Sequence, residues 1–260
     1  MTGEWIALVF ARWLNFVAVA GLFGMALFPL YVPEAARGAY LAQRTMRSLM
    51  IVGGALTLAS TFAWAGAALV NMAGDGSALW DRSAWLSFLF DTSFGLAWVA
   101  RGALAIAIML TICGTRGRSA FAAVVALSAG LLISQAWVGH VASLAAPARW
   151  GVTLAYALHV LGAGAWFGGL LSLAIAMKGP RAIAASERKT AEELLVRFSS
   201  VGLAAVAAII IGGLINMLAH GAFTPEMLFA SSWGRALAVK VALVVGMLLL
   251  AGANRFILMP

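Results

Sequence analysis

Charged residues are scarce in this chain, since Asp, Glu, Lys and Arg make up only 10% of its 260 residues. Soluble domains usually contain about 25%, so the composition excludes an ordinary water-soluble protein. Cysteine is almost missing: Cys113 is the only one, which excludes a disulfide within the chain. The three histidines do not form the HExxH motif of zinc enzymes.

Hydrophobic residues are correspondingly abundant, at 63% of the chain with a mean hydropathy of +0.99. A helix of about 20 apolar residues crosses roughly 30 Å of hydrocarbon, and such runs are too long for the strands of a barrel. The sequence therefore predicts an all-α, polytopic membrane helical bundle with seven transmembrane helices. The seven runs are 5–32, 49–73, 94–113, 120–141, 150–177, 200–220 and 233–254.

The basic residues are distributed unevenly between the loops. Most lie in the connections at 33–47, 114–119 and 178–198, whereas the alternate connections carry Asp75, Asp81 and Glu226. Because cytoplasmic loops of membrane proteins are rich in Lys and Arg, we expect the amino terminus to be periplasmic. The net charge of +8 is then a sign of topology, and the expected surroundings are a lipid bilayer and no nucleic acid.

Two halves of the chain resemble each other. "LNFVAVAGLFGMAL" at 14–27 aligns with "LHVLGAGAWFGGLL" at 158–171, and "TSFGLAWVARGAL" at 92–104 aligns with "SSWGRALAVKVAL" at 231–243. This pairs Asn15 with His159 and Arg101 with Lys240, in the same helix order. We predict a parallel four-plus-four repeat. Residues 1–146 form its first four helices, and residues 147–260 form three helices and stop before an expected eighth.

The predicted topology places all three histidines in the outer half of the membrane or at its outer edge. At 1.5 Å per residue, His140 and His220 lie near the outer surface and His159 lies in the outer half of the membrane. Met217 is one turn from His220. Imidazole and thioether groups suit copper, particularly Cu(I). We therefore predict a copper site formed by these four residues, although His159 could instead form a hydrogen bond to a neighbouring helix.

Several residues are expected to support that site. A metal-bound imidazole usually has its second nitrogen held by a neighbour, and Asn15, Asn216 or a backbone carbonyl group near the glycines could do this. Gly162, Trp166 and Gly169 share the His159 side of their helix, and small residues there allow another helix to approach closely.

The runs "LHVLGAGAWFGGLLSL", "VRFSSVGL" at 196–203, "GGLINM" at 212–217 and "ANRF" near the end resemble the copper resistance protein D family of bacterial inner-membrane proteins. The resemblance covers most of the chain and is strongest from His159 onward. It implies an eight-helix protein that transports copper in copper uptake, homeostasis or resistance, alongside a periplasmic copper-binding protein.

A haem protein is the alternative. Arg12, Arg101 and Lys240 share the predicted outer half with the histidines, and cations repel a copper ion. Arg101 and Lys240 would instead suit the propionates of a haem b that has histidine ligands. The sequence thus leaves open a membrane redox or haem-metabolism protein. We do not expect an enzyme, unless this haem alternative holds.

Overall fold

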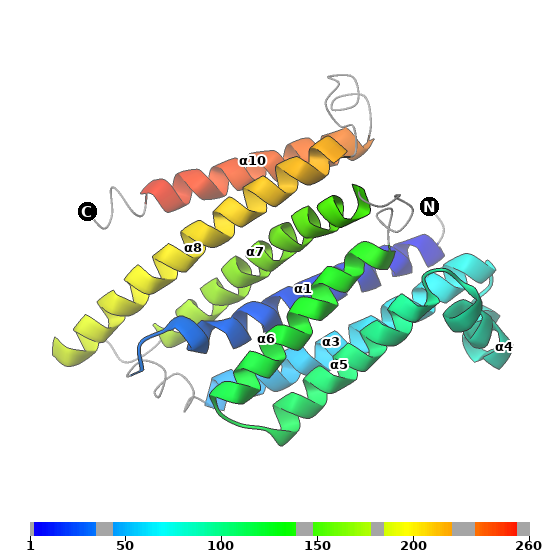
Figure 1. The fold of residues 1–260 in the computed structure, drawn as a ribbon, viewed down its shortest axis with the longest axis horizontal. Helices are drawn as coiled ribbons and strands as arrows, with labels where there is room; N and C mark the ends of the chain where they lie inside the picture. Colours follow the sequence, from blue (N-terminus) through cyan, green and yellow to red (C-terminus); the bar gives the residue numbers. More distant parts are fainter. Residues whose placement is uncertain (1–2, 35–43, 139–147, 178–184, 220–231, 254–260) are drawn as a thin grey trace. The chain divides into compact units, whose positions relative to one another are not determined.

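The computed structural model describes residues 3–34, 44–138, 148–177, 185–219 and 232–253, and their regular structure is entirely helical. The chain divides into two compact units, residues 1–212 and residues 213–260. Figure 1 shows the helices in chain order. The predicted all-α class is confirmed for this part of the chain.

Six of the described helices are long and apolar enough to cross a membrane. They overlap the first six predicted runs, and most of their ends differ by one to several residues. A further helix, α10, lies at the seventh run but is not among the six. The seven-helix count and the internal repeat therefore stay predictions. The long helices are α1 (Gly3–Tyr31), α3 (Arg44–Ala73), α5 (Gly95–Gly114), α6 (Arg118–Ile133), α7 (Ala148–Ala176), α8 (Ala185–Ala219) and α10 (Ser232–Ala253).

Helix α1 is the centre of the first unit, because it packs against α3, α6 and α7, while α5 packs against α3 and α6. Its side chains Val19, Leu22 and Phe28 are fully buried in the core, together with Ile108 of α5 and Leu131 of α6. The first unit is thus organised around α1, whose buried residues lie mainly between Asn15 and Pro29. The second unit contains α10 and the end of α8.

Glycines set the crossing of α1 and α7. A Cβ atom built on Gly24 would lie 2.7 Å from the Cα of Gly168, and one built on Gly168 would lie 2.6 Å from the Cα of Gly24. No real side chain tolerates such distances to backbone atoms. The two helices therefore approach backbone to backbone, as small residues permit inside membranes.

The connection between α3 and α5 folds into three short helical segments: η1 (Gly76–Trp80), α4 (Arg82–Leu86) and η2 (Ser87–Asp91). Asp75 caps η1 through the amide of Ser77, and Asp81 caps α4 through the amide of Ser83. The side-chain hydrogen bonds from these serines, and then the amide bonds, lower the pKa of both carboxyl groups.

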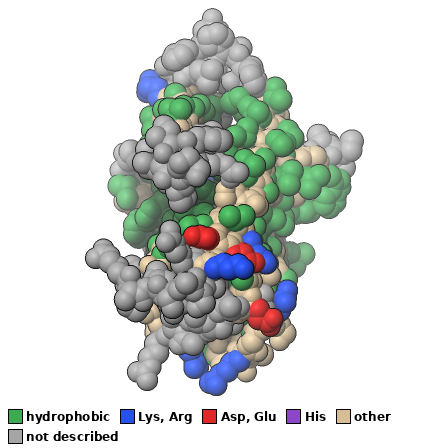
Figure 2. Space-filling view, turned by 90° about the vertical axis from the view of Figure 1, so that its left-hand side faces the viewer, with side chains coloured by type: hydrophobic (Ala, Val, Ile, Leu, Met, Phe, Trp, Pro, Cys, Tyr) green, Lys and Arg blue, Asp and Glu red, His purple; other side chains and the backbone are tan. Residues whose placement is uncertain are grey.

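Two arginines complete the other end of α1. Arg118 of α6 donates a hydrogen bond to the carbonyl of Leu30, and Arg197 of α8 donates one to the carbonyl of Tyr31. The last carbonyl groups of a helix lack partners within the helix and carry partial negative charge, so cations stabilise them. Figure 2, viewed from this end of the bundle, shows Lys and Arg side chains gathered there with acidic ones between them.

Candidate metal site

His159 lies on α7, half-buried, with its ring against α8. Its Nδ1 is 2.8 Å from the carbonyl oxygen of Ile209. A carbonyl oxygen can only accept, so Nδ1 must carry the proton and donate the hydrogen bond. Neutral imidazole then has its lone pair on Nε2, and no described residue forms a hydrogen bond to that atom. The ring is held in the tautomer that binds metals through Nε2.

Glycines bring α8 close enough for this contact. A Cβ on Gly212 would lie 2.7 Å from the amide nitrogen of His159, and a Cβ on Gly162 would lie 2.7 Å from the carbonyl oxygen of Ala205. Gly169 faces the ring of Phe198 in the same way, at 2.9 Å. The small residues thus line the contact of α7 with α8, and the half-buried Trp166 lies near Gly202 of α8.

The other predicted ligands lie either outside the described residues or in the second unit. His140 and His220 lie outside the described part of the chain, and the half-buried Met217 belongs to the second unit. Asn216, half-buried, and Lys240, exposed, also belong to that unit. Within the described ranges, no group of three or more His, Cys, Asp or Glu side chains could hold a metal ion. Among the predicted ligands in the first unit, His159 lies within the described residues and forms a hydrogen bond to Ile209.

Asn15 does not hold the imidazole ring. It is fully buried on α1, where its Oδ1 accepts a hydrogen bond of 2.8 Å from Arg101. Its amide nitrogen donates to Ser60 at 3.0 Å and to Thr61 at 2.8 Å on α3. The group that holds the second ring nitrogen of His159 is the carbonyl of Ile209, one of the alternatives that the sequence left open, and not Asn15.

Arg101 is fully buried on α5, rather than extended toward the membrane surface. Its Nη1 donates to the hydroxyl of Ser134 at 2.9 Å and to the carbonyl of Leu131 at 3.3 Å, and its Nη2 donates to Asn15. Its Nε has no hydrogen-bond partner among the described residues. The groups that accept hydrogen bonds from this charge are all neutral.

Aromatic rings and further amides enclose the same charge. The guanidinium carbon lies 4.6 Å from the ring centre of Trp64 and 5.4 Å from that of Trp98, which is within cation–π distance. Gln135 donates to Asn15 at 3.4 Å and accepts from Tyr156 of α7 at 3.2 Å. The result is a polar network that joins α1, α3, α5, α7 and the segment η3 (Ser134–Val138).

The sequence analysis missed this network. It treated Asn15 and Arg101 as members of separate sites, and it did not select Ser60, Thr61 or Gln135. The available signal was polar side chains inside apolar runs, which usually face the interior of a bundle. Which of them meet depends on how the helices pack.

Comparison with known proteins places the chain among copper proteins of bacterial membranes. Residues 1–150 match the family described as "Copper resistance protein D-like, N-terminal domain", and residues 192–260 match "Copper resistance protein D". No solved structure matches the chain.

Three relatives are similar in sequence. Inner membrane protein YebZ of Escherichia coli is 30% identical over 98% of this chain and 84% of its own length. Copper resistance protein D of Pseudomonas syringae pv. tomato is 31% identical over 92% of this chain and 78% of its own. Copper transport protein CutJ of Bacillus subtilis is 31% identical over 65% of this chain and 31% of its own.

Proposed function

Because the chain belongs to the copper resistance protein D family, we propose that it transports copper ions across the bacterial inner membrane through a site that includes His159. The family supports a copper-related function in a membrane, and the apolar helices supply the bilayer-spanning part. One relative is named an inner membrane protein, which supports that location. Copper is the cargo of this activity, and no chemical conversion by the protein is part of the proposal.

The observation that carries the proposal is the hydrogen bond from Nδ1 of His159 to Ile209. A bond of this kind orients a ligating imidazole and fixes its tautomer. It leaves Nε2, a nitrogen suited to copper, as the donor atom.

One imidazole does not hold copper alone. We propose that His140, His220 and Met217 supply the remaining ligands, with Met217 favouring Cu(I) because a thioether is a soft ligand. A site of few ligands allows the ion to exchange, which transport requires. The amino terminus is periplasmic in this proposal, and a periplasmic copper-binding protein delivers the ion.

The deciding experiment is copper accumulation in cells that express the full chain, His159→Asn or His159→Ala at matched levels. The amide of Asn can replace the Nδ1 donor to Ile209, but it has no group at the position of Nε2. If Nε2 is a ligand, both variants lose the accumulation above that of cells without the protein, while His159→Asn keeps a thermal unfolding midpoint close to that of the wild type.

A purely structural histidine predicts a different pattern. His159→Asn would then accumulate copper like the wild type, and only His159→Ala, which loses the hydrogen bond, would be less stable. That result would remove His159 from the transport site.

The haem alternative gains no support from Arg101, because its terminal nitrogens already bond to Asn15, Ser134 and Leu131. We expect the purified protein to show no Soret absorption band after expression with added haem precursor. A stoichiometric Soret band would favour haem binding and count against the copper proposal.

A further inference from the structure

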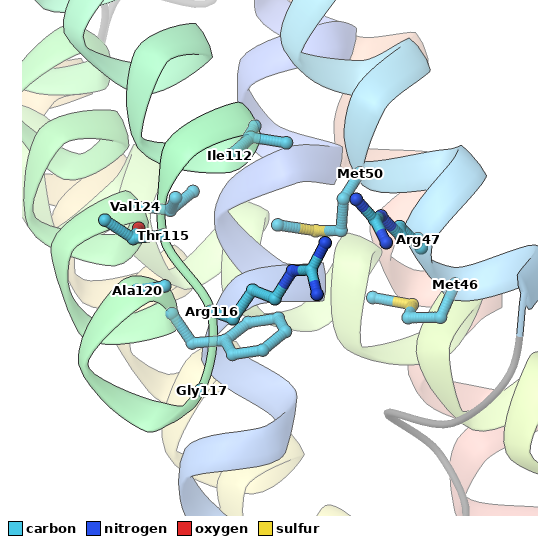
Figure 3. A pocket seen from close by; sticks show the side chains of 10 residues that line it. Met46, Arg47, Met50, Ile112, Thr115, Arg116, Gly117, Ala120 and Val124 are labelled. Atoms are coloured by element: carbon cyan, nitrogen blue, oxygen red, sulfur yellow. The ribbon is translucent and has the colours of Figure 1, made fainter.

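A pocket of about 240 Å³ lies at the end of the first unit where α3 begins, α5 ends and α6 begins. Figure 3 shows its walls from close by. None of the residues proposed above as copper ligands lines this pocket. Its lining residues are Met46, Arg47, Met50, Ile112, Thr115, Arg116, Gly117, Ala120, Phe121 and Val124.

Two guanidinium groups face this pocket from opposite walls. Arg47 comes from α3 and Arg116 from the turn between α5 and α6, and their side chains reach toward each other across the space beside Met50 (Figure 3). Neither forms a salt bridge or hydrogen bond with any described residue, and no carboxylate is among the lining residues. Two cations that converge without a counter-ion favour an anionic ligand.

The remaining walls of the pocket are apolar. Met46, Met50 and Val124 are buried at its base, and Ile112 and Phe121 line its sides. A small inorganic anion would gain nothing from these walls, whereas an amphiphile would place hydrocarbon against them. The chemistry of the pocket therefore requires a negative group joined to an apolar chain.

We propose that this pocket binds one anionic phospholipid, with Arg47 and Arg116 holding its phosphate and the apolar wall accepting the start of an acyl chain. Arginine binds phosphate through two parallel hydrogen bonds. Basic pockets between membrane helices recognise anionic head groups in this manner. The pocket lies where transmembrane helices end, which is the depth of the head groups, and α6 begins there without a side-chain cap at Gly117.

A copper site is the competing interpretation of the same residues. Met46 and Met50 are four residues apart on one face of α3, and thioether groups bind Cu(I). However, two guanidinium groups at the mouth would repel the ion, and within the described residues no third soft or imidazole ligand lines the pocket. The charge therefore favours the lipid.

Native mass spectrometry of the full chain in neutral detergent tests the proposal. Phosphatidylglycerol should bind one per protein, about tenfold more tightly than phosphatidylcholine with the same acyl chains, since the latter has no net charge. Replacing both arginines (Arg47→Gln with Arg116→Gln) should abolish this preference. The control Arg82→Gln removes an exposed arginine of α4, and should leave it unchanged.

Three results would overturn the proposal. The first is equal binding of the two lipids, and the second is an unchanged preference in the double variant. The third is displacement of phosphatidylglycerol by an equal concentration of inorganic phosphate, which would mean that the apolar wall contributes nothing.

A second variant covers the case in which the glutamine pair does not fold. Arg47→Lys with Arg116→Lys keeps both charges but not the paired hydrogen bonds, and should weaken phosphatidylglycerol binding about threefold. Unchanged affinity there would overturn the assignment of the phosphate to the guanidinium groups.

Discussion

At the scale of single residues, Arg101 has the most unusual surroundings. A charge inside an apolar bundle costs several kcal/mol unless its neighbours compensate it. Here the compensation comes from Asn15, Ser134 and the rings of Trp64 and Trp98. Trp98 lies on the same helix as Arg101, whereas Asn15, Trp64 and Ser134 come from α1, α3 and η3, so the arginine also joins α5 to those segments.

Replacing Arg101 should therefore affect stability strongly. We expect Arg101→Ala to lower the free energy of unfolding by about 3 kcal/mol, because it leaves a cavity and removes the donors to Asn15. Arg12→Ala should cost less than about 1 kcal/mol, since Arg12 is exposed and its guanidinium group lies over the faces of Phe16 and Trp64. Thermal unfolding midpoints in detergent compare the two variants, and equal shifts would contradict a special role for Arg101.

At the scale of helices, the contact of α1 with α7 depends on the absence of side chains. Gly168→Ala should destabilise the protein by about 2 kcal/mol, because its Cβ would meet the backbone of α1 and force the helices apart. Gly151→Ala is the matched control on the same helix: nothing lies within 4 Å of its Cβ position. That change should be neutral or stabilise by about 0.5 kcal/mol, since Ala favours a helix. Thermal unfolding again provides the measurement, and two equal losses would refute the close crossing.

The caps of the segment between α3 and α5 predict a pH dependence. Because the pKa values of Asp75 and Asp81 in the folded state are lowered from 3.8, the ionised carboxylates stabilise this segment above that pH. The stabilisation is lost as the pH falls through the folded pKa. The amides of Ser77 and Ser83 should then exchange hydrogen faster, relative to intrinsic rates, than at neutral pH.

The control for the capping prediction is Asp81→Asn. Asparagine caps a helix about as well as aspartate but does not titrate. In this variant, acid should no longer speed hydrogen exchange at the amide of Ser83, while it should still do so at the amide of Ser77. An identical increase at both amides would show that titration of the caps is not the cause.

At the scale of the whole molecule, Cys113 offers a direct test of topology. It is exposed at the end of α5, next to a connection that the basic residues predict to be cytoplasmic. A membrane-impermeant maleimide should not label it in intact spheroplasts, but should do so after permeabilisation. A cysteine at Ser77, in a Cys113→Ser background, should show the opposite pattern. Reversed labelling would invert the membrane orientation and place His159 in the inner half.

The helices were largely predictable from the sequence. Six of the seven apolar runs match helices able to cross a membrane, with ends that differ by several residues. The largest differences are in α8, which begins at Ala185 rather than at residue 200, and in the connection after α3, whose short helices were not predicted. The first residues of α8 are rich in charge, and each short helix after α3 is five residues long, so a search for apolar runs of about 20 residues finds neither.

The candidate site was only partly predictable. Sequence reasoning selected His159 and offered a backbone carbonyl group as a partner, but it could not choose Ile209 from among many carbonyl groups. Asn15 was one of three alternative partners for the histidine, together with Asn216 and a backbone carbonyl group, whereas its Oδ1 accepts a hydrogen bond from Arg101, 86 residues away. The sequence predicts the depth of a side chain in the membrane, but not which neighbouring helix it faces, because that depends on the rotation of each helix about its axis.

The sequence by itself determined that this is a membrane protein, which segments are long and apolar enough to cross a bilayer, and which connections carry most of the positive charge. The free energy of transferring a segment into hydrocarbon is roughly the sum of contributions from its own residues, so local composition is enough to predict these properties. Only the tertiary structure decided that Asn15 meets Arg101, that His159 turns to α8, and that Arg47 and Arg116 share a pocket. The contact of His159 with α8 follows from the close approach of the two helices at Gly212, and all three contacts depend on packing between segments rather than on any one segment.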